Sequence, residues 1–232
     1  MEDSTYFQPI SALQEDRKAA FVSRTYGHVA LAVLAFIGVE TLMLDSELIT
    51  NFMLSLMSGW TWLLLLVAFG FVTNYTEKMA YQATEKSTQY LAMGIFVVAE
   101  ALIFVPLLHI ALYYSNGGPD TITQAAIITL ALFAGLSAVA LFTKRDFSFL
   151  KTILTVGFFI AVGLIVAGML FGFNLGLWFS VGMVALAAGS ILYQTSNLFH
   201  RYHEQQHVAA ALGLFASLML LFWYILSILN RN

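Results

Sequence analysis

Long apolar segments, separated by short polar connections, make up most of the 232-residue chain. A helix that crosses the roughly 30 Å hydrocarbon core of a bilayer needs about 20 mostly apolar residues, because each residue adds about 1.5 Å of rise. The pattern therefore predicts an all-α integral membrane protein, a bundle of seven transmembrane helices. The segments that meet the length requirement are residues 26–44, 55–73, 89–114, 122–143, 150–172, 175–199 and 207–229.

The residues outside these segments are too few for a second, soluble domain. We expect a polar N-terminal tail over residues 1–25, a transmembrane domain over residues 26–229 and a short C-terminal end over residues 230–232. The tail is acidic and lacks the features of a cleavable signal, so the first apolar segment is expected to stay in the mature protein. Such a tail is either a handle for a protein partner or a disordered terminus.

Positive charges fall almost entirely on one side of the predicted helices. Lys and Arg in short loops mark the cytoplasmic side of a membrane protein. Nine of the ten lie in the tail or in and beside the second, fourth and sixth connections, whereas Arg231 lies alone at the C-terminus. This split predicts a cytoplasmic N-terminus and an external C-terminus, which requires an odd number of spans.

Composition narrows the class of protein. Hydrophobic residues make up 60% of the chain and charged residues 10%, whereas a soluble domain has about 25% charged residues. A soluble enzyme, a disordered protein and a nucleic-acid-binding protein are therefore excluded, and the net charge of −3 offers no basic patch for phosphates. Because the chain has no cysteine, disulfides and thiolate metal sites are also ruled out. We expect the lipid bilayer as the environment and no cofactor.

Two carboxyl side chains lie inside the predicted spans. Glu100 is near the centre of the third span, and Glu40 is toward the outer end of the first. Ionisable side chains inside a bilayer are costly and often mark ion or proton pathways. Pro106, which frees a backbone carbonyl one turn earlier, and His109 follow Glu100. Glu100, Glu40 and His109 are therefore candidates for an ion pathway or an intramembrane polar site. The alternative is a protonated Glu that is hydrogen-bonded to a neighbouring helix.

The sixth predicted span ends in a run of polar side chains. This run either lines a cavity or forms a seam of hydrogen bonds between helices, and in both cases it faces away from lipid. Its members are Tyr193, Gln194, Thr195, Ser196 and Asn197.

Residues 203–207 read H-E-Q-Q-H and fit the H-E-x-x-H pattern of zinc peptidases. On an α-helix this spacing places both imidazoles on one face, with the Glu as general base. A catalytic zinc needs a third protein ligand, and no Asp, Glu or His follows His207. His200 could complete a surface metal site with His203 and His207. The segment is therefore a zinc peptidase motif, a metal site without catalysis, or a solvated and pH-responsive loop.

Several motifs together resemble the Bax-inhibitor (transmembrane Bax inhibitor motif) family, in particular its bacterial YccA-like branch. The fourth span ends in T-K-R-D-F-S-F over residues 143–149, and the sixth ends in I-L-Y-Q-T-S-N over residues 191–197. Weaker matches are A-A-I-I-T over residues 125–129, A-E-A over residues 99–101 and H-V-A-A-A-L-G-L-F over residues 207–215. The resemblance covers the chain from Arg24 onward.

The resemblance implies a bundle of seven helices with the last helix near its centre. Some family members are pH-sensitive calcium leaks, in which a pair of aspartates on the sixth and seventh spans shares a proton and forms a gate. The matching positions in this chain are Gln194 and Ser217. Neither side chain titrates, so the carboxylate gate is lost while hydrogen bonding between the helices can persist. Since calcium prefers several charged oxygens, the loss also weakens an ion pathway.

Three functions follow from these features. The resemblance to the YccA-like branch implies a non-enzymatic protein of the bacterial cytoplasmic (inner) membrane that restrains the membrane-anchored AAA protease FtsH. A second hypothesis is a leak for calcium or protons with Glu100 in its path. A third is a zinc peptidase that uses His203, Glu204 and His207.

Overall fold

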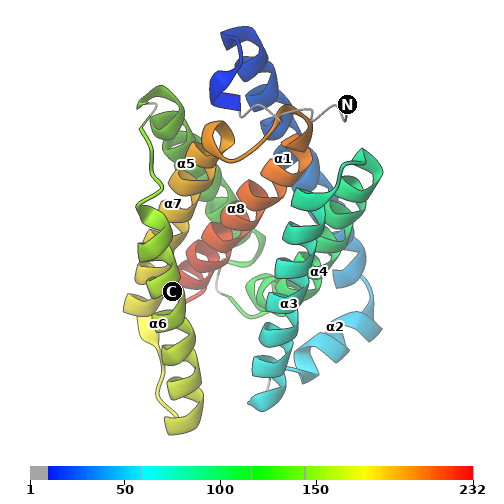
Figure 1. Ribbon diagram of the computed structural model, residues 1–232. Coiled ribbons are helices and arrows are strands. Elements are labelled where there is room, and N and C mark those ends of the chain that lie inside the picture. The colour runs from blue at the N-terminus through cyan, green and yellow to red at the C-terminus, as the bar shows by residue number, and fades with distance from the viewer. Residues whose placement is uncertain (1–9, 58, 116, 144, 232) are drawn as a thin grey trace.

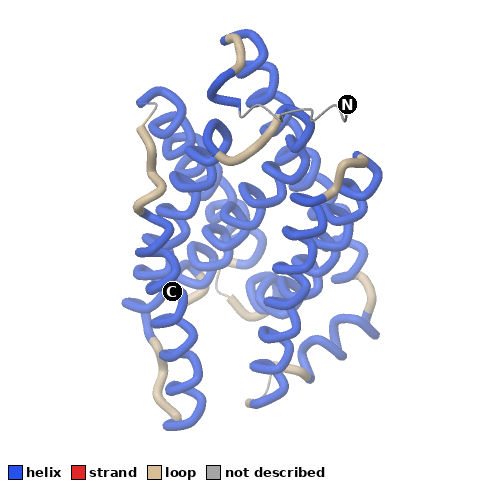
Figure 2. Tube along the Cα trace, viewed as in Figure 1, coloured by secondary structure: helices blue, strands red, loops and turns tan. Residues whose placement is uncertain are grey.

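The computed structural model describes residues 10–57, 59–115, 117–143 and 145–231, and all regular structure in these ranges is helical (Figures 1 and 2). The prediction of an all-α protein is therefore confirmed. The elements are η1 (Ile10–Ala12), α1 (Glu15–Leu44), α2 (Glu47–Ser55), α3 (Trp60–Gln82), α4 (Lys86–Tyr113), α5 (Gly118–Thr143), α6 (Leu150–Phe171), α7 (Gly176–His200), η2 (Glu204–Gln206) and α8 (His207–Leu229).

Six of these helices are long and apolar enough to cross a membrane: α1, α4, α5, α6, α7 and α8. The second predicted span differs from the structure. Ser55 ends α2 and Trp60 begins α3, and the two helices are bent by 108° at this break. Gly59 lies in the break with a φ of 58°, a backbone conformation that residues with a Cβ seldom adopt. The structure thus has seven spans only if the bent pair counts as one.

α8 occupies the centre of the bundle (Figure 1). It packs against α1, α3, α4, α5 and α7. Its first half carries alanines and Gly213, which let neighbouring backbones approach closely, and large side chains such as Phe215 fill the space further along. This position agrees with the one that the family resemblance implies for the last helix.

α6 lies at the edge of the bundle, where its substantial packing is against α7 alone (Figure 1). The contact uses small residues: Gly189 of α7 faces Leu154, and Gly157 of α6 faces Leu186. Most of the other side chains of α6 are exposed in the isolated chain, among them Phe158 and Phe159. This exposure fits a helix that faces lipid.

The N-terminal region is more structured than a free tail. α1 begins at Glu15, eleven residues before the predicted start of the first span at Tyr26. Ahead of it, Ile10 is fully buried and its N–H donates to the carbonyl of Tyr202 at 3.3 Å. Ile10 therefore packs against the connection between α7 and α8, and Arg17 forms an ion pair with Glu204 of that connection. The first nine residues of the predicted tail lie outside the described ranges.

Candidate functional site

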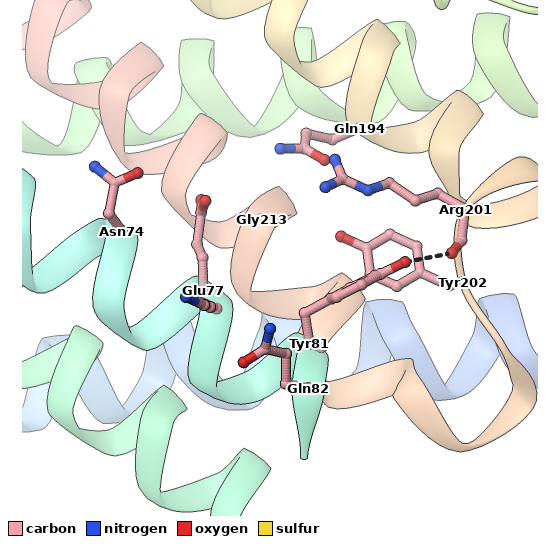
Figure 3. Close-up of a pocket in the computed structure, with 10 residues that line it drawn as sticks. Asn74, Glu77, Tyr81, Gln82, Gln194, Arg201, Tyr202 and Gly213 are labelled. Atoms are coloured by element: carbon pink, nitrogen blue, oxygen red, sulfur yellow. Dashed lines mark hydrogen bonds between the residues drawn. The ribbon is translucent and has the colours of Figure 1, made fainter. Parts of the chain in front are cut away.

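A polar pocket of about 330 Å³ lies between α3, α7 and α8, at the end of the bundle where α7 connects to α8 (Figure 3). It contains Gln194, one of the two positions that match the paired aspartates of the family. The residues that line it are Asn74, Glu77, Lys78, Tyr81, Gln82, Gln194, Arg201, Tyr202, Ala209 and Gly213.

Gln194 and Ser217 do not pair with each other; they lie in successive layers of the α7–α8 contact. Gln194 packs over Gly213, where a Cβ atom would lie only 3.1–3.2 Å from the side-chain amide. One turn away, the hydroxyl of Ser217 is 2.8 Å from that of Ser190, and it also donates to the carbonyl of Gly213 at 3.0 Å. Each α7 side chain thus meets a small residue of α8, and neutral hydrogen bonding and close packing occupy the place of a carboxylate pair.

A carboxylate nevertheless reaches the pocket, from a different helix. Glu77 of α3 points toward the space shared with Gln194 and Arg201 (Figure 3). Glu77 lies beyond residues 55–73, the predicted second span, and was not among the candidate residues. The signal that could have found it is its helical spacing, because Asn74, Glu77 and Tyr81 recur at intervals of three and four residues and share one face.

Arg201 and Tyr81 fasten the α7–α8 connection over this pocket. The Tyr81 hydroxyl donates to the carbonyl of Arg201 at 3.3 Å, and the Arg201 guanidinium carbon lies 5.2 Å from the centre of the Tyr81 ring. Tyr202 is buried beside them, and this burial raises the pKa of its phenol.

The pocket is lined by one acidic side chain, Glu77, and by two basic side chains, Lys78 and Arg201, so its formal charge is +1. It is therefore a poor match for a divalent cation, which prefers several carboxylate oxygens.

Two other residues of the polar run at the end of the sixth span bond to other parts of the bundle. Thr195 lies 3.2 Å from the Tyr26 hydroxyl of α1. Ser196 accepts from the N–H of Phe147 at 3.1 Å. Asn197 is buried, and within the described residues its side-chain nitrogen has no hydrogen-bond partner. Tyr193 is half-buried. Thr195 and Ser196 therefore join α7 to α1 and to the α5–α6 connection, and Gln194 is the residue of the run that lines the polar pocket.

Glu40 and Glu100 are both buried, but they face different pockets. Glu40 lines a pocket between α1, α4, α5 and α8, and Glu100 lines another between α3, α4, α6 and α8. Met219 of α8 lines both. His109 lines neither; its ring is 4.7 Å from that of Tyr113. The structure thus places the three candidates for an ion pathway or an intramembrane polar site, Glu40, Glu100 and His109, apart from one another.

The H-E-x-x-H segment does not adopt the helix that a zinc peptidase needs. His203 has an extended backbone, residues 204–206 form the short 3-10 helix η2, and His207 begins α8 with its ring 4.9 Å from that of His28. Glu204 forms an ion pair with Arg17. Across the described ranges, no three His, Cys, Asp or Glu side chains are close enough to hold a metal ion, so His200, His203 and His207 do not form a ligand set.

The connection itself is held from several sides. Gln206 donates to the carbonyl of Tyr81 at 2.7 Å and accepts from the N–H of His203 at 3.0 Å. Gln89 of α4 donates to the carbonyl of Gln205 at 3.3 Å. The segment, for which a solvated loop was one of the three alternatives, is thus tied to α1, α3 and α4.

A family model for the inhibitor of apoptosis-promoting Bax1 matches residues 18–232, which is nearly the whole chain. The chain belongs to the Bax inhibitor family. Within the family, it is 31% identical over 153 residues to the Escherichia coli protein described as Modulator of FtsH protease YccA, a match that covers 66% of this chain and 68% of that relative. The resemblance to this family and to its YccA-like branch is therefore confirmed.

Two further relatives show the range of this Bax inhibitor family. An uncharacterized protein of Pseudomonas aeruginosa is 38% identical over 124 residues, which cover 53% of this chain and only 55% of that relative. A Golgi anti-apoptotic protein of vaccinia virus is 24% identical over 234 residues, 99% of this chain and 92% of the viral one. Together with the apolar helices, these matches identify a multi-pass membrane protein.

Proposed function

We propose that this Bax inhibitor family member is a non-enzymatic protein of the bacterial cytoplasmic membrane that modulates a membrane-anchored AAA protease of the FtsH kind. The observation that carries the proposal is the similarity to a relative described as a modulator of that protease. The polar pocket supports it, because neutral side chains and a net positive charge replace the paired aspartates expected of a calcium leak.

The proposed topology has seven spans, with the bent pair α2 and α3 as the second, and a cytoplasmic N-terminus. The start of α1, the end of α3 and the α7–α8 connection lie at one end of the bundle (Figure 1). These parts carry five of the ten basic residues and the adjoining start of α4 adds a sixth: Arg17, Lys18, Arg24, Lys78, Arg201 and Lys86. Arg231, in contrast, follows the far end of α8. The positive-inside rule therefore supports a cytoplasmic location for the end that holds the polar pocket.

The test is reconstitution with the protease in proteoliposomes. We expect the chain to be captured with an FtsH-type protease from mild detergent and to slow degradation of a membrane-protein substrate severalfold. An unrelated multi-pass protein at the same molar ratio controls for dilution of the bilayer. Degradation that proceeds at the same rate with the chain and with this control would contradict the proposal.

A cation leak is the second candidate, and one specific observation favours it. The pocket with Glu77 and the pocket with Glu100 follow one another along α3 and α8: Asn74 lines the first and its neighbour Thr73 lines the second. On α8, Gly213 lines the first and Ala216 the second. Two carboxyl groups thus lie along one interhelical route.

Calcium and proton flux into dye-loaded liposomes tests the leak. If the route conducts, Glu100→Gln and Glu77→Gln should each change the flux, whereas Glu47→Gln, an exposed site in α2, should not. Absence of flux at every pH from about 5 to about 8, a range that spans ordinary histidine titration, would exclude this candidate.

A further inference from the structure

Glu40 is a buried acid whose carboxyl group has no hydrogen-bond partner among the described residues. Its residue is 4% exposed, and both carboxyl oxygens lack a hydrogen-bond partner among the described residues. An ionised carboxylate in an apolar environment without a counter-charge costs several kcal/mol. Protonation removes the charge but leaves an O–H donor unpaired, which is also unfavourable. The described residues therefore satisfy neither protonation state of Glu40.

The carboxyl group lines a pocket of about 460 Å³ whose walls are otherwise almost entirely apolar. Phe36, Leu108, Leu218 and Phe222 contribute side chains from three helices. Among the described residues, no Lys, Arg or His lines this pocket. His109 follows Leu108 on α4 but is not among the lining residues. Nothing in the walls therefore offers a positive charge to Glu40.

The other polar groups of the pocket are already engaged. The hydroxyl of Thr41 donates to the carbonyl of Ile37 at 2.7 Å, and that of Thr129 donates to the carbonyl of Ala125 at 2.7 Å. Thr123 donates to the carbonyl of Pro119 at 3.1 Å. These are bonds to the preceding turn of the same helix, so the three threonines are not donors to Glu40.

The pocket opens sideways between α1 and α5. Both helices pack against α4 and α8, but they contact each other little. Three side chains that line the pocket, Ile37, Ile127 and Leu130, are more than half exposed in the isolated chain, at 53%, 63% and 52%. A ligand could therefore enter laterally from the lipid phase.

We propose that this pocket binds a protonated amine with an apolar body. An N–H⁺ group would satisfy the carboxylate by a charge-assisted hydrogen bond, and the apolar body would contact the walls. The volume falls within the range of about 300–1,000 Å³ that is typical of small-molecule sites. A calcium ion does not fit, because it takes about 6–8 oxygen ligands and this pocket offers one carboxylate. The inference does not depend on the proposed function.

Decylamine, decanol and decanoate are matched probes, because they share a chain length and differ in the charge of the head group. Binding is measured on the full chain in nanodiscs of zwitterionic lipid, with empty nanodiscs subtracted. We expect saturable binding of decylamine, and Glu40→Gln should weaken it about tenfold or more through loss of the charge-assisted bond. Decanol should bind the wild type and Glu40→Gln with the same affinity, and so should decanoate. The Gln variant removes a buried charge and should fold.

Two further variants sharpen the result. Ala126→Phe fills the pocket while it keeps the carboxyl group, so it should also abolish decylamine binding. Glu47→Gln makes the same charge change at an exposed position of α2 and should leave binding intact. A photoreactive alkylamine should label α1 and α5 in the wild type but not in Glu40→Gln. Equal decylamine binding by wild type and Glu40→Gln, or no saturable binding at all, would overturn the proposal.

Discussion

The hydroxyl of Ser196 accepts a hydrogen bond at 3.1 Å from the backbone N–H of Phe147, 49 residues earlier in the chain. It also donates to the carbonyl of Arg145 at 3.3 Å. Ser196 belongs to the I-L-Y-Q-T-S-N motif and Phe147 to the T-K-R-D-F-S-F motif. The two most specific motifs of the family resemblance are therefore in direct contact, and in this structure that contact fastens the α5–α6 connection to the end of α7.

Ser196→Ala is expected to destabilise the protein by about 1–3 kcal/mol. The substitution removes the acceptor of the Phe147 N–H, and Phe147 is partly buried. The matched control is Ser227→Ala in α8. The Ser227 hydroxyl only donates to the carbonyl of Trp223, one turn back, so its loss should change stability by a few tenths of a kcal/mol. Thermal unfolding in detergent compares the two; similar shifts would argue against a structural role for the motif contact.

The contribution of Asp146, in the same α5–α6 connection, to the stability of the protein should depend on pH. The N–H and hydroxyl of Ser148 donate to its carboxylate and hold the pKa of Asp146 below its usual range. Because the pKa of Asp146 is lower in the folded than in the unfolded protein, ionised Asp146 stabilises the fold at pH values above the unfolded pKa of about 4. This stabilisation is lost as the pH falls through the folded pKa. Wild type should therefore be more stable than Asp146→Asn at about pH 6, and the difference should vanish well below the folded pKa. A difference in melting temperature that stays constant with pH would contradict this.

Gly213 is required by the close approach of Gln194. In Gly213→Leu the new side chain collides with the Gln194 amide, and overpacking of this kind costs about 1–3 kcal/mol. Gly163→Leu on α6 is the control, because a Cβ there meets no atom within 4 Å. The double variant Gln194→Ala with Gly213→Leu should recover part of the loss. A melting temperature of Gly213→Leu that matches that of Gly163→Leu would show that the layer tolerates more volume.

Gln206 should be the main anchor of the α7–α8 connection. Gln206→Ala removes the bond to the carbonyl of Tyr81 and the bond from the N–H of His203. We expect a loss of about 1–3 kcal/mol, because both backbone groups lose a partner, and faster amide exchange over residues 203–207. Gln205 is exposed, so Gln205→Ala is the matched control and should exchange like the wild type. Unchanged exchange in Gln206→Ala would show that other contacts hold the connection.

Much of the fold follows directly from the sequence. The predicted bounds of the last five spans agree with the helices to within four residues, and for α8 both ends coincide. Local chain properties determine these helices, because uninterrupted apolar runs of this length leave the backbone no other way to satisfy its hydrogen bonds in lipid. The bend between α2 and α3 escaped the prediction, since apolar residues continue on both sides of it.

The sequence identified candidate residues, but it did not show which of them share a pocket. Glu40 and Glu100 are equally buried acids in apolar helices, yet they face separate pockets on different sides of Met219. Glu77 was missed because it lies beyond the most apolar part of its helix. Which side chains share a pocket depends on the rotation of each helix and on the helices packed around it, and a single sequence carries little information on either.

Composition and apolar run length thus determined that the protein is helical and belongs in a membrane, and the motifs determined its family. The family resemblance implied a central last helix, but only the tertiary structure showed which helix lies inside the bundle and why. Both α6 and α8 are strongly apolar, but 6% of the most apolar stretch of α6 is buried, against 56% for α8. The physical reason is that lipid tails are as apolar as a protein interior. Hydropathy therefore does not distinguish a helix that faces lipid from one that other helices surround, whereas the close packing of small residues such as Gly213 does.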